Sequence, residues 1–98
     1  MVHDPEATVI DAIVLIEAEP ARIAELADEL VARQGVAEVY SVTGEYDLVA
    51  MVRVGAHEDL ADVVTHGIAQ SDGVRRTRTL VAFRAYRDTD YAWDIGAD

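Results

Sequence analysis

Val42-Thr43-Gly44-Glu45-Tyr46-Asp47-Leu48 lies between two runs rich in β-branched and apolar residues, 36–42 and 47–54, and both runs are typical of strands. Glycine adopts a positive φ without steric cost, so Gly44 permits a tight reversal between them. The connection is short enough to join the runs as an antiparallel hairpin and to fix its register. This hairpin is the centre of the predicted fold.

A strand and a helix stand on each side of the hairpin. The pattern predicts a strand over 11–18 and a helix over 20–34 before it, and a helix over 57–71 and a long strand over 74–86 after it. The order βαββαβ predicts an α+β, ferredoxin-like fold. In this fold a four-stranded antiparallel sheet carries both helices on one face.

The apolar residues are distributed in a way that leaves one sheet face uncovered. Each predicted helix has a single apolar stripe at helical spacing, so each helix covers the sheet from one side only. The strands over 11–18 and 47–54 are apolar on both faces. An exposed apolar sheet face marks an interaction surface, and we therefore expect a homodimer with the sheets packed face to face, a dimeric α+β sandwich. The stripes consist of Ile23, Leu26, Ala27, Leu30 and Val31, and of Leu60, Val63, Val64 and Ile68.

Composition narrows the possible functions. The 98 residues suit one domain, and they carry a net charge of −11 with no lysine. Neutralising a nucleic-acid backbone needs clustered basic residues, and the nearest to a cluster here is 75–78, so we expect no direct nucleic-acid binding. There is no cysteine, and the three histidines do not have metal-ligand spacing, so neither a metal nor another cofactor is expected. No apolar run is long enough to cross a bilayer, and we expect a cytoplasmic protein.

The hairpin loop offers the groups that a small polar ligand needs. Gly44 allows a close approach to the backbone, Thr43 has a hydroxyl, Asp47 has a carboxylate, and Tyr46 can form an aromatic wall. The simpler alternative is that Gly44 makes a turn and Asp47 caps it.

Two further hydroxyls lie on the last predicted strand. Thr77 and Thr79 are two residues apart, so both point to one face, whereas Arg76 and Arg78 point to the other. They could present hydroxyls side by side to a ligand, or they could be ordinary β-branched strand residues.

Taken together, these motifs resemble the effector domain of the Lrp/AsnC transcription regulators, also called the RAM domain. The resemblance is carried by the loop 40–48, followed by Gly73-Val74 and by Thr77-x-Thr79, and it extends over about 12–86. Family members usually carry an N-terminal helix-turn-helix domain. Only about ten residues precede the first predicted strand here, so a stand-alone form is expected.

The resemblance implies roles for six residues. Backbone amides near Gly44 would hold the α-carboxylate of an amino-acid effector, and Asp47 would take its ammonium group. Tyr46 would form the pocket wall, and Thr43 belongs to the same loop. Further hydrogen bonds would come from Thr77 and Thr79. The resemblance also implies dimers that assemble into rings, often octamers, with the ligand in a cleft between dimers and with full-length Lrp/AsnC regulators as potential partners.

The predicted organisation is a lead-in over 1–10, a ligand-binding domain over 11–86 and a tail over 87–98. The tail is polar except for Tyr91, Trp93 and Ile95, which could dock it against the domain. One alternative function is a small dimeric α+β-barrel enzyme of the monooxygenase type, which would need a roomy cavity between sheet and helices. Another is a purely structural oligomer with an empty cleft.

Overall fold

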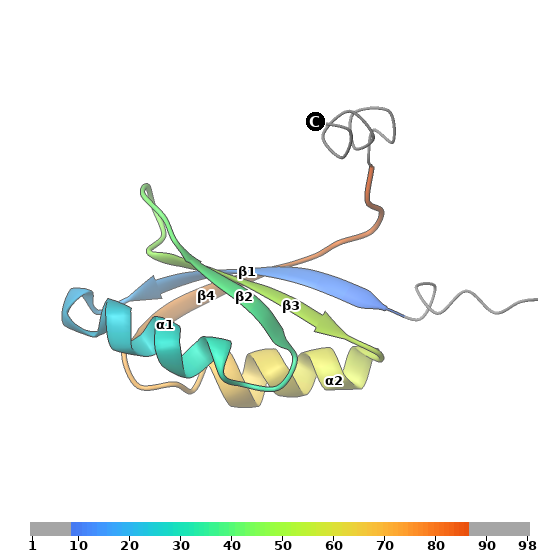
Figure 1. Cartoon of the computed structure of the whole chain (residues 1–98), viewed down its shortest axis with the longest axis horizontal. Helices are drawn as coiled ribbons and strands as arrows, with labels where there is room; N and C mark the ends of the chain where they lie inside the picture. The colour runs from blue at the N-terminus through green and yellow to red at the C-terminus, as the bar shows by residue number, and fades with distance from the viewer. Residues whose placement is uncertain (1–8, 87–98) are drawn as a thin grey trace, which may run out of the picture.

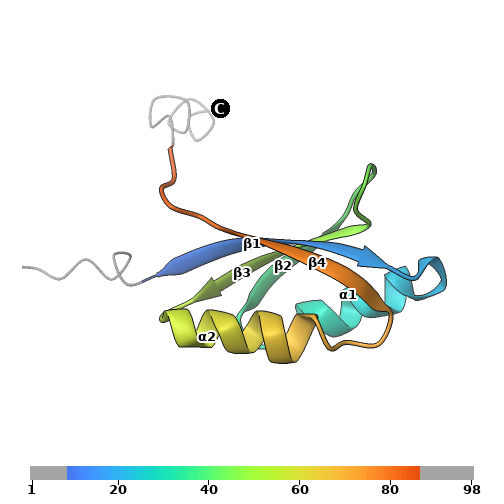
Figure 2. The same ribbon diagram turned by 180° about the vertical axis from the view of Figure 1, so that it is seen from behind.

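The computed structural model describes residues 9–86, and it has the predicted ferredoxin-like α+β architecture. The sheet is antiparallel with the strand order β2-β3-β1-β4, and both helices lie against one of its faces (Figure 1). The reverse view shows that the other face carries no helix (Figure 2). The elements are β1 (Ile10–Ala18), η2 (Pro20–Arg22), α1 (Ile23–Val31), β2 (Val36–Ser41), β3 (Leu48–Val54), α2 (His57–Ala61), η3 (Asp62–Ile68) and β4 (Val74–Val81).

The core fills the layer between the sheet and the helices. Alternate residues of β1 point into it, as the two-residue period of a strand requires, and Ile16 is completely buried. Leu26 and Leu30 of α1 and Ile68 of η3 are completely buried against the sheet. Aliphatic side chains thus occupy the layer in which a barrel enzyme would need its cavity. The buried hydrophobic residues are Ala12, Val14, Ile16, Ala18, Leu26, Leu30, Val36, Leu48, Ala50, Val52, Leu60 and Ile68.

Three details of the elements differ from the sequence-based expectations. Val31 was predicted in the buried stripe of the first helix, but it lies in the last turn of α1 and is 46% exposed. The second helix was predicted to be regular, but its second half, η3, is a π-helix in which the Ala69 amide donates to the Val64 carbonyl at 2.8 Å. The last strand was predicted to reach residue 86, but β4 ends at Val81, the register partner of Ala12 on β1.

The sheet face opposite the helices, called the open face below, is apolar at its centre. Ile13 and Leu15 of β1 and Val49 and Met51 of β3 point to it, and each is only partly buried. Toward the sheet edges, Tyr40 of β2 is 49% exposed and Leu80 of β4 is 46% exposed.

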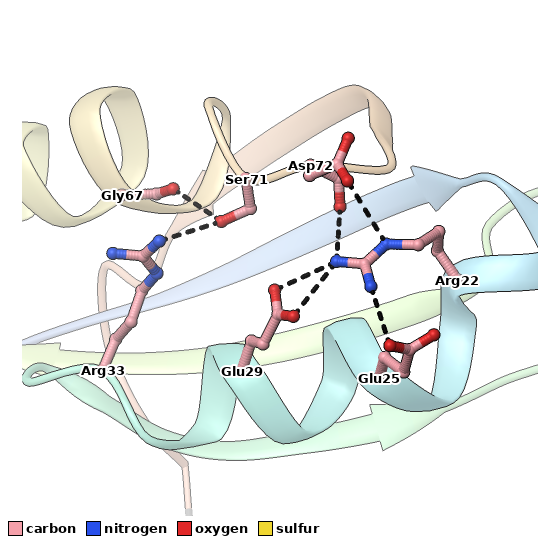
Figure 3. A network of polar contacts seen from close by, with 7 residues as sticks. All are labelled: Arg22, Glu25, Glu29, Arg33, Gly67, Ser71 and Asp72. Carbon is pink, nitrogen blue, oxygen red and sulfur yellow. Dashed lines mark hydrogen bonds and ion pairs between the residues drawn. The ribbon is translucent and has the colours of Figure 1, made fainter.

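A polar network joins α1 to the turn that enters β4 (Figure 3). The Arg22 guanidinium donates to both carboxylate oxygens of Glu29 at 3.1 Å and to the Asp72 carbonyl at 3.2 Å. It also pairs with Glu25 at 3.2 Å. A Cβ on Gly73, whose φ is +99°, would lie 2.9 Å from the Arg22 Cβ, so the turn passes close to this side chain. The network therefore fixes where β4 begins.

The predicted tail, with Tyr91, Trp93 and Ile95, lies outside the described residues, as does most of the predicted lead-in. Within residues 9–86 no helix is long and apolar enough to cross a membrane. The same residues contain no group of three His, Cys, Asp or Glu side chains that could hold a metal ion.

Candidate functional site

The hairpin loop projects from the sheet on the side away from the helices (Figure 1). Its base is closed by a hydrogen bond from the Val42 amide to the Asp47 carbonyl at 3.0 Å. Gly44 has a φ of +120°, and no atom of residues 9–86 lies within 4 Å of the position that a Cβ would take there. Thr43 and Gly44 are both exposed. The loop therefore presents its backbone to the surroundings rather than to the rest of its own chain.

Asp47 anchors the loop to the end of β1. Its Oδ2 accepts a hydrogen bond from the Ala18 amide at 2.8 Å, and its own amide donates to the Ile16 carbonyl at 2.9 Å. The β1–β4 register shifts between Glu17 and Ala18, at the same point. Among residues 9–86 no donor reaches the second oxygen, Oδ1. The carboxylate thus caps a neighbouring strand rather than its own turn, and one of its oxygens has no donor within the described residues.

Tyr46 is held by a residue that the sequence did not indicate. The Arg76 guanidinium carbon lies 5.6 Å from the centre of the Tyr46 ring, in the range of a cation–π contact. Arg76 also pairs with Glu17, with 3.4 Å between Nε and Oε1. Glu17 and Arg76 are register partners on β1 and β4, so this contact places the Tyr46 ring over the open face. The arginine-rich run 75–78 was the available signal, but its relation to Tyr46 required the strand register.

Thr77 and Thr79 lie on the helix side of the sheet. Thr77 is the register partner of the fully buried Ile16, and Thr79 is that of Val14, and partners in an antiparallel pair share a face. Both threonines are half-buried, and neither hydroxyl has a hydrogen-bond partner within residues 9–86. The prediction that they share one face, opposite Arg76, is confirmed.

The fold brings five of the six predicted residues to one end of the sheet, with Thr79 opposite Val14 in the middle of β1, but it does not gather the six in one cavity. The loop and the first half of β4 both lie at the end of the sheet where β1 finishes, because Ala18 contacts Asp47 and pairs with Val74. Tyr46 lies over the open face, whereas Thr77 lies on the other. A cavity of about 370 Å³ is bordered by 34–35, 53–55, 59 and 62–63 at the opposite end of the sheet, and none of the six residues lines it.

Comparisons with known proteins agree on one family. The family model of the Lrp/AsnC ligand binding domain matches residues 11–92. The chain is 30% identical over 78 residues to the HTH-type transcriptional regulator FL11 of Pyrococcus furiosus, a match that covers 80% of this chain and 51% of the regulator. The chain thus spans about half the length of the curated relatives it matches.

Solved structures show the same fold. TTHA0845 from Thermus thermophilus is 53% identical, with a TM-score of 0.76 over 81% of this chain and 99% of that protein. The transcriptional regulator NMB0573 from Neisseria meningitidis, solved as an L-Met complex, is 15% identical with a TM-score of 0.76. That match covers 90% of this chain and 60% of the regulator, and it supports the fold alone.

Proposed function

Because this chain belongs to the Lrp/AsnC ligand-binding domain family, we propose that it is an effector-binding domain for an amino acid, and that it works as a homo-oligomer. The observation that carries the proposal is the loop at 43–47. Its glycine backbone is exposed, and Asp47 Oδ1 is left without a donor among residues 9–86 while Oδ2 is held by β1.

The two ends of an amino acid suit the two parts of this loop. Backbone amides beside Gly44 bind the α-carboxylate, and Asp47 Oδ1 binds the α-ammonium group. Because Oδ2 is fixed to the Ala18 amide, the carboxylate is oriented before the ligand arrives, which lowers the entropic cost of binding. Hydrogen bonds to an ionised group are stronger than neutral ones, so this contact contributes much of the affinity.

Two copies of the chain are needed to complete the site. In one chain Tyr46 and Thr77 lie on opposite faces of the sheet, so a single small molecule does not contact both. We place the ligand between dimers, where the loop of one copy meets the threonines of another. The dimers form through the open face, and they assemble further into a ring such as an octamer.

In this proposal the chain acts on regulation through protein partners rather than by binding DNA itself. We propose that the chain assembles with full-length Lrp/AsnC regulators through the same surfaces and changes their response to the effector. A pull-down from cell extract with tagged chain tests this step. Failure to recover any such regulator, with and without amino acids, contradicts it.

Calorimetric titration with a panel of amino acids tests ligand binding. We expect heat and a thermal shift for at least one of them, and loss of both in Asp47→Asn. Glu45→Gln, which removes a carboxylate from the same loop, is the matched control and should bind as the wild type does. Absence of heat and of a thermal shift for every amino acid would favour a purely structural oligomer.

A further inference from the structure

The open face carries its charges in a regular arrangement around an apolar centre. Ile13, Leu15, Val49 and Met51 occupy the two inner strands β1 and β3. The outer strand on one side, β2, adds Glu38 opposite Met51, and the outer strand on the other side, β4, adds Arg78 opposite Leu15. An apolar centre with a charged rim is the anatomy of a protein interface.

At each end of the open face, an ion pair forms between two residues of the same chain. Asp11 Oδ1 lies 2.7 Å from Arg53 Nε at one end, and Glu17 pairs with Arg76 at the other. Arg78 differs from these arginines, because it has no ion-pair or hydrogen-bond partner within residues 9–86. Covering the open face would bury an unpaired charge at Arg78 unless the covering surface supplies a carboxylate.

A second copy of the chain supplies that carboxylate in one arrangement. Two identical sheets can stack face to face about a twofold axis that runs along the strands or across them. An axis along the strands, between β1 and β3, places β2 of one copy over β4 of the other, because the strand order is β2-β3-β1-β4. An axis across the strands places β4 over β4 and brings the two Arg78 side chains together.

We propose that Arg78 of each copy pairs with Glu38 of the other, and that this reciprocal pair fixes how the two open faces stack. The proposal rests on the dimer of the proposed function and specifies its geometry. Glu38 and Arg78 lie one row apart, two residues along the strands, which is about 7 Å and within the reach of an arginine side chain. In the same arrangement Ile13 and Leu15 pack on Val49 and Met51 of the facing copy.

Charge exchange tests the pair, with dimer dissociation measured by analytical ultracentrifugation of the full chain. Arg78→Glu places two carboxylates at each contact, and Glu38→Arg places two guanidinium groups there. We expect each single variant to raise the dissociation constant of the dimer about 100-fold, because facing like charges cost several kcal/mol. The double variant in one chain should dimerise as the wild type does.

Mixing the two single variants gives a second and sharper readout. A copy with Glu at both positions and a copy with Arg at both positions restore both contacts, so the mixture should form heterodimers in large excess over homodimers. Native mass spectrometry with one variant isotopically labelled measures the ratio. Arg75→Glu, on the same strand at the β-bulge, and Glu58→Arg, on α2, are the charge-matched controls and should leave dissociation unchanged.

The outcomes separate the pair from the dimer. A wild type that sediments as a monomer overturns the dimer of the proposed function and the pair with it. A dimeric wild type whose double variant stays as weak as the single variants, or whose mixed variants pair at random, overturns the Arg78–Glu38 contact alone. Circular dichroism of each variant checks that a loss of dimer is not a loss of fold.

Discussion

Replacing Asp47 with alanine and with asparagine separates the contact that its carboxylate makes with β1 from the ligand contact that we propose for it. Oδ2 accepts the Ala18 amide at 2.8 Å, and Ala18 is only 2% exposed, so water does not replace a missing acceptor easily. A buried donor left without a partner costs about 1–3 kcal/mol. We therefore expect Asp47→Ala to lower the free energy of unfolding by about 2 kcal/mol. Asparagine keeps an acceptor oxygen at the same place, so Asp47→Asn should cost less than about 1 kcal/mol.

The two variants should lose ligand affinity to a similar extent, although they differ in stability. Both remove the negative charge that we assign to the ammonium group of an amino acid. Hydrogen bonds to charged groups contribute about 1.5–3 kcal/mol, so the affinity should fall about 10- to 100-fold in both. Asp47→Asn should therefore be nearly as stable as the wild type and still bind poorly.

Urea unfolding and calorimetric titration measure the two effects. Every variant is compared at one protein concentration, because the stability of an oligomer depends on it. Glu45→Gln, two residues away in the same loop and exposed, controls for the loss of a surface charge. An Asp47→Asn protein that binds amino acids as the wild type does refutes the ammonium contact. An Asp47→Ala protein that unfolds at the same urea concentration as the wild type refutes the anchoring of the loop to β1.

Two further predictions concern backbone strain and a tyrosine pKa. In urea unfolding, Gly35→Ala should lower the free energy of unfolding by about 1–3 kcal/mol more than Gly44→Ala does. Both glycines have a positive φ, but of the two only Gly35 would bring its new Cβ against another side chain, 2.8 Å from Val63 Cγ2. Equal losses of stability in the two variants would contradict this contact. The Glu38 carboxylate raises the pKa of the Tyr40 phenol above its usual 10.0, first by accepting a hydrogen bond from the phenol and second by its negative charge. The protonated phenol therefore stabilises the folded state at neutral pH, and this contribution is lost as the pH rises through the raised pKa. In Glu38→Gln an absorbance titration should give a lower pKa for Tyr40, and an unchanged value would show that Glu38 is not the cause.

The fold was predictable because its pattern is local. Strand and helix periods, the glycines after each helix and the turn at Gly44 are readable over a few residues, and they were sufficient to give the element order and the open face. The π-helix η3 was not predictable, because apolar spacing does not distinguish it from an α-helix. The hydrogen bond from the Ala69 amide to the Val64 carbonyl, which identifies the π-helix, is seen only in the structure. So are the contacts at its end, where the Gly67 carbonyl accepts a hydrogen bond from the Ser71 hydroxyl at 2.9 Å and Ser71 Oγ accepts one from Arg33 (Figure 3).

The sequence allowed the candidate residues to be named, but it did not reveal their contacts. The loop motif identified Asp47, but its partner Ala18 lies 29 residues away in the sequence, and their contact depends on how β1 and β3 pair. The contact between Arg76 and Tyr46 was not predictable for the same reason, because it depends on the β1–β4 register. Sequence spacing placed Thr77 and Thr79 on one face correctly, yet only the sheet shows that this face is the one covered by helices.

That placement limits how the threonines can meet a ligand. β4 is an edge strand, so its outer side is open to a neighbouring molecule, and Thr77 and Thr79 are half-buried beside that edge. A ligand that contacts both Asp47 and a threonine of the same chain would have to pass around the edge from one face to the other. A second loop arriving at the edge from another copy avoids this problem, because its Gly44 backbone is exposed and a Cβ there would meet nothing within 4 Å in residues 9–86 of its own chain. For the proposed function, this architecture favours a site whose loop and whose hydroxyls come from different copies, and we therefore expect ligand affinity to depend on assembly beyond the dimer.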